Sequence, residues 1–264
     1  IIMSYKTLTV NTKNKVCTMK FNRPDKLNAF DTEMVLETQD ALNQITEDTG
    51  IKALIITGEG KGFSAGADLS DSSGIDDLSN DRLVYEGLVN GYKPSLLQIM
   101  NMPKPVIGAI NGAAAGIGSA FALACDLVVM SDKAYIKQAF VNIALIPDGG
   151  LNWLLTRTVG YRLAYEMAIE GNNISANRCL ELGLANKVVA HDDLMKTSIQ
   201  WAESLAKKSS QSLRETKRVM RMAMTNDYES VFEQEAEANN ELHGSKDSLE
   251  AIQAFFEKRE PNFD

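Results

Sequence analysis

Short runs of apolar residues, separated by turn-forming residues, dominate the first half of the chain. Residues 5–11 and 15–22 are rich in β-forming residues, and the segment Thr12-Lys13-Asn14 between them predicts a hairpin. Three further apolar runs are short, continuous and bounded by turn residues, so they predict buried strands. These runs are residues 53–57, 106–110 and 127–130.

Apolar residues at helical spacing alternate with these strands and then fill most of the second half. Asp31 is a helix-capping residue, and apolar side chains follow it at helical spacing as far as Ile45. Further helices are predicted over about residues 81–100, over 119–124, and over most of 151–264 apart from a short run at 185–189. The polar segment 70–80 is expected to be an exposed, mobile loop. Alternating strands and helices followed by a helical part predict an α/β fold with a helical appendage.

The composition is that of a folded globular protein. The chain has 264 residues, of which 44% are hydrophobic and 23% charged, so it can bury a large core and is neither disordered nor a coiled coil. Its net charge of −8 argues against a nucleic-acid partner and against binding to a membrane surface. The cysteines Cys17, Cys125 and Cys179 lie far apart in the sequence, which predicts free thiols in a reducing compartment and no metal site.

One stretch, residues 106–130, is long enough to cross a membrane. It is rich in alanine and glycine and contains Asn111 and Asp126, so it fits a buried strand, a glycine loop and a buried helix better. The first residues lack the apolar core of a signal peptide. We therefore expect a cytoplasmic protein.

Two glycine-rich turns carry the candidate chemistry. Residues 62–68 (GFSAGAD) and 112–118 (GAAAGIG) each follow a predicted strand, and the second opens a helix. Glycine lets the backbone approach a ligand, and amides at a helix N-terminus are unpaired donors. Two such turns facing each other would form an oxyanion hole, a pair of N–H groups for a carbonyl oxygen that becomes negative. Simple tight packing is the alternative interpretation.

Two other motif interpretations are weaker. The second turn lacks the third glycine of a dinucleotide-binding loop, because Phe121 stands where that glycine belongs. The first turn contains G-x-S-x-G with Ser64, which is typical of a serine hydrolase, but no helix is predicted to follow the serine directly. Its partner would have to be His191 or His243, and both are better interpreted as exposed structural histidines.

A family signature includes both turns and extends over essentially the whole chain. In order and spacing, its segments resemble the crotonase (enoyl-CoA hydratase/isomerase) superfamily. They are residues 22–29 (NRPDKLNA), 63–69 (FSAGADL), 103–107 (PKPVI), 111–112 (NG), 116–118 (GIG), 125–126 (CD), 146–150 (IPDGG), 174–176 (ISA) and 254–259 (AFFEKR). The resemblance implies a crotonase-like spiral of β-β-α units with a C-terminal helical trimerisation region. We assign residues 1–200 to the spiral core and 201–264 to the helical oligomerisation region.

The resemblance also implies roles for individual residues. The amides of Ala67 and Ile117 would hold the thioester oxygen of an acyl-coenzyme A as it becomes an enolate. Coenzyme A would enter as part of the substrate, so no separate cofactor is expected. The residues implied in substrate binding are Lys26, Leu27 and Ala29 for the nucleotide part, Ala65, Gly66, Asp68, Leu69, Gly116 and Phe140 around the acyl thioester, and Phe255 and Lys258 for the coenzyme A of a neighbouring subunit. The carboxylates of Asp68 and Asp126 are themselves interpreted as structural or backbone-capping.

The informative feature is a departure from the family pattern. The family's hydratases carry two glutamates that activate water, and their positions are occupied here by Ala120 and Phe140. Asp148 instead matches the acidic residue of Δ3-Δ2-enoyl-CoA isomerases, which the resemblance implies as a single acid/base. Apolar walls from Phe140, Ile143 and Leu145 would raise its pKa. The alternative is a turn residue in Pro-Asp-Gly-Gly.

Four functional hypotheses follow from these residues. The first is an isomerase that moves the double bond of an enoyl-CoA with Asp148 as acid/base. The second is an enoyl-CoA hydratase, or another thioester enzyme, with atypical catalytic residues. A serine hydrolase using Ser64 and an inactive acyl-CoA-binding module are the others. The apolar helical C-terminal part predicts a homotrimer or a dimer of trimers.

Overall fold

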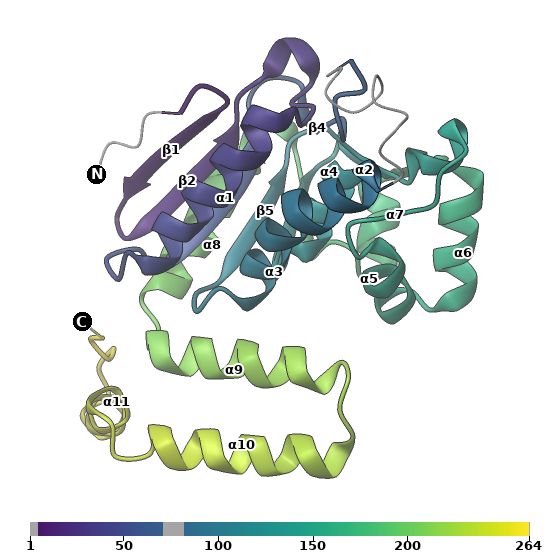
Figure 1. The fold of residues 1–264 in the computed structure, drawn as a ribbon. Coiled ribbons are helices and arrows are strands. Elements are labelled where there is room, and N and C mark those ends of the chain that lie inside the picture. The colour runs from purple at the N-terminus through teal and green to yellow at the C-terminus, as the bar shows by residue number, and fades with distance from the viewer. Residues whose placement is uncertain (1–4, 71–81, 264) are drawn as a thin grey trace.

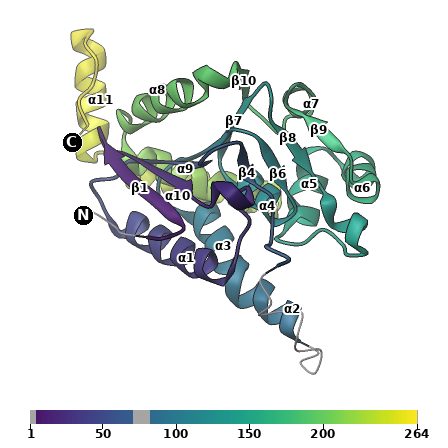
Figure 2. The same cartoon turned by 90° about the horizontal axis from the view of Figure 1, so that it is seen from above.

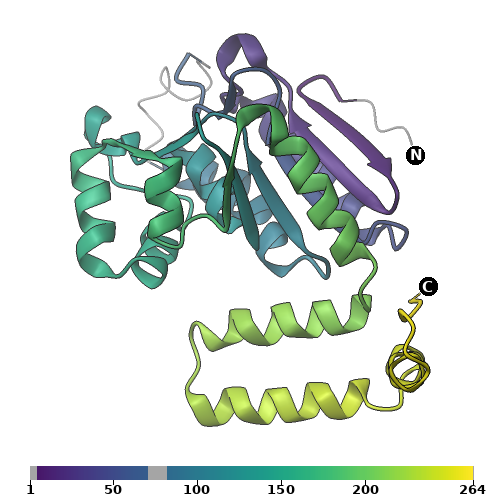
Figure 3. The same ribbon diagram turned by 180° about the vertical axis from the view of Figure 1, so that it is seen from behind.

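The computed structural model describes residues 5–70 and 82–263, so the expected loop at 70–80 lies outside it except for Ser70. A large twisted sheet and a smaller sheet form the centre, and helices cover the large sheet on both faces (Figures 1 and 3). This arrangement is the α/β class that the hydrophobic pattern predicts.

Within the described residues the larger sheet has six strands. In spatial order they are β1 (Leu8–Lys13), β2 (Val16–Phe21), β3 (Ala53–Gly58), β5 (Val106–Ile110), β7 (Leu127–Ser131) and β10 (Lys187–Val189). β1 and β2 form the expected antiparallel hairpin, and the remaining pairs are parallel. Every residue of β3 and β5 is buried, as expected for parallel strands with helices on both faces.

The smaller sheet consists of very short strands. In order they are β4 (Gly62–Ser64), β6 (Ala113–Ala115), β8 (Tyr135–Lys137) and β9 (Asn173–Ser175). β3, β5 and β7 of the larger sheet are each followed in the chain by a strand of the smaller sheet and then by a helical segment. Successive turns of the chain therefore stack as a spiral of β-β-α units, which confirms the crotonase-like fold.

Two layers of helices cover the larger sheet. One face packs against α1 (Thr32–Glu47), α3 (Lys93–Asn101) and α4 (Ile117–Ala124). The other face packs against α8 (Leu194–Ala206), which is seen in front of the sheet in Figure 3. The two layers use alternate residues of β3: Leu54 and Ile56 belong to the first core, and Ala53 and Ile55 to the second.

The other helical segments surround this core. They are η1 (Pro24–Lys26), α2 (Leu83–Glu86), the π-helical η2 (Gly87–Tyr92), η3 (Ala139–Ile143), α5 (Leu151–Thr158), α6 (Tyr161–Glu170), α7 (Ala176–Glu181) and η4 (His191–Asp193). The predicted helix over 81–100 is the run α2, η2 and α3. The spacing of apolar residues did not predict that part of this run is π-helical.

Three further helices form the C-terminal part: α9 (Ser210–Ala223), α10 (Tyr228–Leu242) and α11 (Lys246–Glu257). α9 and α10 lie side by side below the sheets, and α11 stands apart at the end of α10 (Figures 1 and 2). The predicted division at 200/201 falls inside α8, whose buried residues belong to the core of the sheet. The division itself stays a prediction.

Asp126 attaches this C-terminal part to the core. Its Oδ2 accepts hydrogen bonds from the Val106 amide at 2.9 Å and from Lys217 Nζ at 2.7 Å, and its Oδ1 pairs with Arg221 at 3.0 Å. Lys217 and Arg221 belong to α9. The carboxylate therefore caps the start of β5 and also anchors α9. This agrees with the prediction that Asp126 has a structural role.

Sequence and structure differ at the shortest elements. The turns at 62–68 and 112–118 contain the strands β4 and β6, and α4 begins at Ile117 rather than at residue 119. The strands β8 and β9 were not predicted. Residues 106–130 are divided among β5, β6, α4 and β7, as expected. In the described part of the chain, no helix is long and apolar enough to cross a membrane.

Candidate active site

The pairing of β4 with β6 brings the two glycine-rich turns together. The strands run parallel, with Gly62 opposite Ala113 and Ser64 opposite Ala114. Beyond them the loops touch: a Cβ added to Gly66, whose φ is +104°, would lie 3.0 Å from the Ala115 carbonyl oxygen. The turns face each other as the oxyanion-hole hypothesis requires, and the tight packing of the alternative interpretation is also present.

The first of the two turns exposes the amide of Ala67. Phe30 pairs with this turn as an isolated parallel bridge: its amide donates to the Gly66 carbonyl, and its carbonyl accepts from the Asp68 amide, both at 2.8 Å. The intervening N–H of Ala67 therefore points to the other side of the strand. No acceptor among residues 5–70 and 82–263 bonds to it.

The second turn leaves the amide of Ile117 without a partner. Ile117 is the first residue of α4, where a backbone N–H has no partner within the helix. Gly116 precedes it with φ +52° and ψ −132°, a conformation that glycine alone adopts without strain. The Ile117 amide also lacks an acceptor anywhere in the described part of the chain. Two unpaired donors thus lie on adjoining loops.

The turn that carries Asp148 packs against the helix that begins at Ile117. It precedes Gly149 and Gly150, which have φ of +60° and +79° and turn the chain into α5. Gly149 fits closely against α4, because a Cβ there would lie 2.4 Å from Ile117 Cδ1 and 2.8 Å from Ala120 Cβ. Only glycine permits this approach, so the turn places Asp148 beside the start of α4.

The carboxyl group of Asp148 is partly buried, and one of its oxygens has no partner. Its Oδ1 is inaccessible to solvent, and no described residue donates a hydrogen bond to it. Burial raises the pKa of Asp148 from 3.8 to about 6. An aspartate that serves a turn accepts a hydrogen bond from a nearby backbone amide, and in the described chain this one does not. The turn needs the two glycines, and the carboxyl remains available for chemistry.

Non-titrating side chains occupy the two positions that the family resemblance implies for the glutamates of hydratases. Ala120 is fully buried beside Gly149, and Phe140 is 6% exposed with its ring tip 4.0 Å from a Cβ placed on Gly116. Both positions border the site, and neither can move a proton. Ile143 and Leu145, which were expected to wall the carboxyl, are about half exposed. The contacts beside Gly149 come instead from Ile117, Ala120 and Leu96.

The segment expected to bind the nucleotide part lies along the first turn. The Leu27 carbonyl accepts a hydrogen bond from the Ala65 amide at 2.9 Å, so the segment is fixed directly to the site. Lys26 is exposed and Leu27 is 44% exposed, whereas Ala29 is buried. Of this segment, the side chains of Lys26 and Leu27 are therefore the ones accessible to a ligand.

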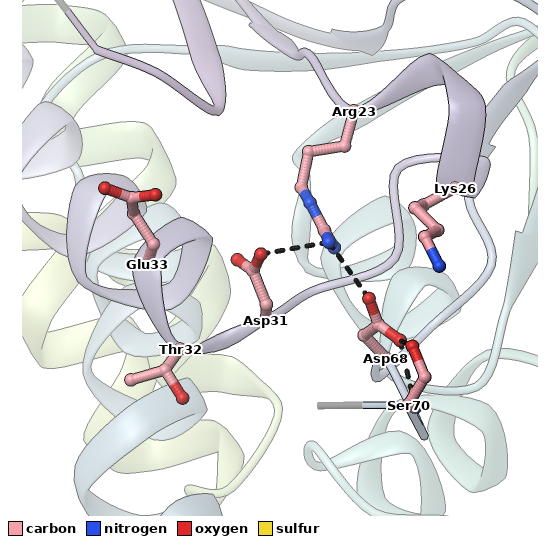
Figure 4. Close-up of a pocket in the computed structure, with 7 residues that line it drawn as sticks. All are labelled: Arg23, Lys26, Asp31, Thr32, Glu33, Asp68 and Ser70. Carbon is pink, nitrogen blue, oxygen red and sulfur yellow. Dashed lines mark hydrogen bonds and ion pairs between the residues drawn. The ribbon is translucent and has the colours of Figure 1, made fainter. Parts of the chain in front are cut away.

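A charged hollow of about 370 Å³ opens beside this segment, between Lys26 and the start of α1 (Figure 4). Arg23 crosses it and pairs with Asp31 and Asp68, each at 3.0 Å. Asp68 also accepts hydrogen bonds from the Ser70 hydroxyl and amide; these bonds and Arg23 lower the pKa of Asp68 to about 2. This matches a structural carboxylate, and the sequence did not reveal the part played by Arg23. The next residue, Leu69, is 60% exposed.

Two predicted site residues lie elsewhere in the chain. Phe255 is 79% exposed near the end of α11, and Lys258 caps that helix. In both views α11 is far from β4 and α4 (Figures 1 and 2). Within one chain these residues do not reach the candidate site.

The serine hydrolase hypothesis is wrong for this structure. Ser64 is fully buried, and its hydroxyl donates to the Asn28 carbonyl at 2.8 Å. His191 bonds instead to Ser131, 3.1 Å away, and His243 is the exposed C-cap of α10. Ser64 thus fixes the turn, and in the described residues neither histidine bonds to its hydroxyl.

Comparisons with known proteins show the family of the chain. A family model described as enoyl-CoA hydratase/isomerase matches residues 11–264. The chain therefore belongs to the enoyl-CoA hydratase/isomerase family, in the crotonase superfamily, and is an enzyme of that family.

Individual relatives carry the names of both reactions. The chain is 36% identical to a 1,2-epoxyphenylacetyl-CoA isomerase of Escherichia coli, over 94% of each chain. It is 33% identical to a probable enoyl-CoA hydratase of Rhodobacter capsulatus, over 99% of each. Among solved structures, an enoyl-CoA hydratase from Bacillus anthracis superposes with a TM-score of 0.92 at 31% identity, over 98% of this chain and 99% of that one.

Proposed function

We propose that the protein moves the double bond of an enoyl-CoA from the 3 to the 2 position, with Asp148 as the single acid/base. The observation that carries this proposal is the partly buried carboxyl of Asp148, whose Oδ1 has no partner in the described residues, on a turn that packs against Ile117; the backbone amides of Ile117 and Ala67 are both unpaired. Ala120 and Phe140 support it, because they stand where the resemblance implies the two carboxylates of the family's water-adding mechanism.

The reaction needs one group that both removes and returns a proton. The carboxylate of Asp148 takes a proton from the α carbon of a 3-enoyl thioester, and the electron pair of that C–H bond moves toward the carbonyl. The amides of Ala67 and Ile117 hold the oxygen of the resulting dienolate. The carboxyl then returns the proton to the γ carbon, and the double bond becomes conjugated with the thioester. A pKa of about 6 suits both steps near neutral pH.

The substrate is proposed to be held by its coenzyme A part, with Lys26 and Leu27 along the nucleotide and Phe255 and Lys258 contributed by a neighbouring subunit. α11 supports the second part, because it presents exposed aromatic side chains away from its own site. Assembly as a homotrimer would bring such a helix to the site of another chain.

Hydration of a 2-enoyl-CoA is the second candidate function, favoured by the name of the Rhodobacter capsulatus relative. The two reactions are separated by incubating the protein with 3-enoyl-CoA and with 2-enoyl-CoA and following the products by mass. Isomerisation leaves the mass unchanged, and hydration adds one water. Hydration much faster than isomerisation would overturn the proposal.

Isotope transfer makes the test sharper. A 3-enoyl-CoA deuterated at its α carbon should deliver part of its deuterium to the γ carbon, because the same shielded carboxyl carries it. Deuterium at the γ carbon would require a single acid/base that is shielded from water. If only solvent hydrogen reached the γ carbon, and Asp148→Asn still isomerised the substrate, Asp148 would not be the single acid/base.

A further inference from the structure

The Gly116 carbonyl and the Ile117 amide belong to one peptide unit, so whatever fixes the carbonyl also directs the amide. In a trans peptide the C=O and N–H bonds point in opposite directions. The Gly116 oxygen accepts two hydrogen bonds from Ser119, one from its amide at 2.9 Å and one from its hydroxyl at 2.7 Å. These bonds direct the Ile117 N–H away from Ser119.

The hydroxyl of Ser119 is held in turn by Gln138. Its single proton is donated to Gly116, so the oxygen accepts the bond from Gln138 Nε2 at 3.1 Å. Both side chains are fully buried. Gln138 follows β8 directly, and the last residue of β8, Lys137, accepts a hydrogen bond from the Gly116 amide at 3.1 Å. The end of β8 thus holds Gly116 at two points: Lys137 binds its amide directly, and Gln138 acts on its carbonyl through Ser119.

The other exposed amide is fixed differently. The carbonyl that shares a peptide unit with the Ala67 amide belongs to Gly66, and it accepts from the backbone of Phe30. No side chain in the described residues bonds to that carbonyl, whereas the Gly116 carbonyl accepts from the Ser119 hydroxyl as well as from the Ser119 backbone amide. Because the backbone of a glycine has few steric restraints, the bond from the hydroxyl adds to the orientation of this peptide unit.

Stability alone does not account for Gln138. Its Oε1 is buried and has no hydrogen-bond partner in the described part of the chain, which is unfavourable for folding. An apolar side chain at this position would avoid that unpaired oxygen. The amide group is explained if the bond from its Nε2 to Ser119 is needed.

We infer that Ser119 and Gln138 are positioning residues that aim the Ile117 amide at the substrate oxygen. This inference rests on the proposed role of that amide. An oxyanion is stabilised only by donors already directed at the place where charge develops. Loss of the relay should therefore weaken catalysis more than binding, although neither side chain touches the substrate.

The test compares Ser119→Ala and Gln138→Leu with the matched control Ser198→Ala. Ser198 is also fully buried and also donates its hydroxyl to a helix carbonyl, that of Leu194 at 2.9 Å, but it lies in α8 on the opposite face of the larger sheet. Both relay variants should lower kcat about 10-fold and change KM by less than about 2-fold, a smaller loss than the roughly 10²–10³-fold of deleting a donor. The control should leave both constants unchanged.

A second measurement detects the hydrogen bond from the Ile117 amide to a bound thioester. Cinnamoyl-CoA has a conjugated thioester and no γ hydrogen, so it cannot isomerise. Hydrogen bonds to its carbonyl oxygen should shift its absorption to longer wavelength when it binds. The relay variants should lose about half of that shift, and the double variant should be no worse than Ser119→Ala, because Gln138 acts through Ser119. Ser119→Cys, whose thiol is a weaker donor, should give an intermediate shift.

The inference would be overturned if Gln138→Leu and Ser119→Cys kept both the wild-type absorption shift of cinnamoyl-CoA and the wild-type kcat, whether or not Ser119→Ala folds. It would also be overturned if the effects of the two single substitutions on the shift were additive in the double variant. The absorbance measurement needs no turnover. A protein that shifts cinnamoyl-CoA through this relay but hydrates rather than isomerises its substrate would refute the proposed function and leave this inference standing.

Discussion

Asp148→Asn is the most informative single change, because it keeps the size and the turn propensity of the side chain and removes its ability to accept a proton. A positioned general base accounts for about 10²–10⁴ in rate, so isomerisation should fall by at least about 10²-fold. Coenzyme A binding should be nearly unchanged, since Lys26 and the two exposed amides are untouched. Asn serves the turn about as well as Asp.

The pH dependence of the wild-type enzyme follows from the same group. With a pKa of about 6, Asp148 is about nine-tenths ionised at pH 7. The rate constant kcat/KM should therefore be level above about pH 7 and fall about tenfold per pH unit well below pH 6. Asp148→Asn should lose this acid limb together with the activity.

Asp148→Asn should raise the thermal stability of the protein, although it lowers the activity. Because burial raises the folded-state pKa from 3.8 to about 6, the folded protein binds more protons than the unfolded chain between these values, and its free energy of unfolding falls as pH rises through that window. A shift of two units corresponds to about 3 kcal/mol, which partial exposure of the group reduces to about 1–2 kcal/mol. Asp148→Asn removes this loss and should raise Tm by about 3–6 °C near pH 8, with no difference below about pH 4.

The assay measures initial isomerisation rates, cinnamoyl-CoA affinity and Tm on the same preparations. The control is Asp227→Asn, an exposed aspartate that also caps a helix; that helix, α10, lies far from β4 and α4 in Figure 1. It should leave turnover unchanged. Near-normal isomerase activity in Asp148→Asn would remove Asp148 from the mechanism. A Tm below that of the wild type near pH 8 would contradict the reasoning from burial.

Three further outcomes are expected. Asp126→Ala should lower the free energy of unfolding by about 3–5 kcal/mol in urea, because it leaves the buried Lys217 without its partner carboxylate; a loss under about 1 kcal/mol would contradict this anchor. Sedimentation should give three or six times the 28.9 kDa chain mass, and Phe255→Asp should lower it; a wild-type monomer at micromolar concentration would refute assembly. A fluorophosphonate serine probe should leave Ser64 unlabelled, because its hydroxyl is buried; covalent labelling there would restore the hydrolase hypothesis.

Elements whose signals are local could be predicted from the amino-acid sequence alone. The helix after Asp31 begins where its cap predicts, with the Asp31 carboxylate accepting from the Met34 amide at 2.8 Å. The apolar run 53–57 is a fully buried strand, because its length and composition fit no exposed structure. The family signature likewise depends on residues in fixed order, and it was sufficient for the fold class. Caps, periodicity and motif spacing can all be read within a few residues.

The tertiary structure decided what depends on residues far apart in the chain. The strands β4, β6 and β8 are three residues long and exist only because each pairs with a neighbour, so their own sequences could not reveal them. Whether the Ala67 amide is free depends on Phe30, more than thirty residues earlier.

The chemistry of the site depended on the tertiary structure in the same way. The burial that raises the pKa of Asp148 is created by the chain folding around it, and the Ser119–Gln138 hydrogen bond joins a helix to the end of a strand. Desolvation and hydrogen bonding act over ångströms in space, whereas sequence patterns record only distance along the chain. The residues could therefore be named from the sequence, but their protonation, orientation and pairing could not.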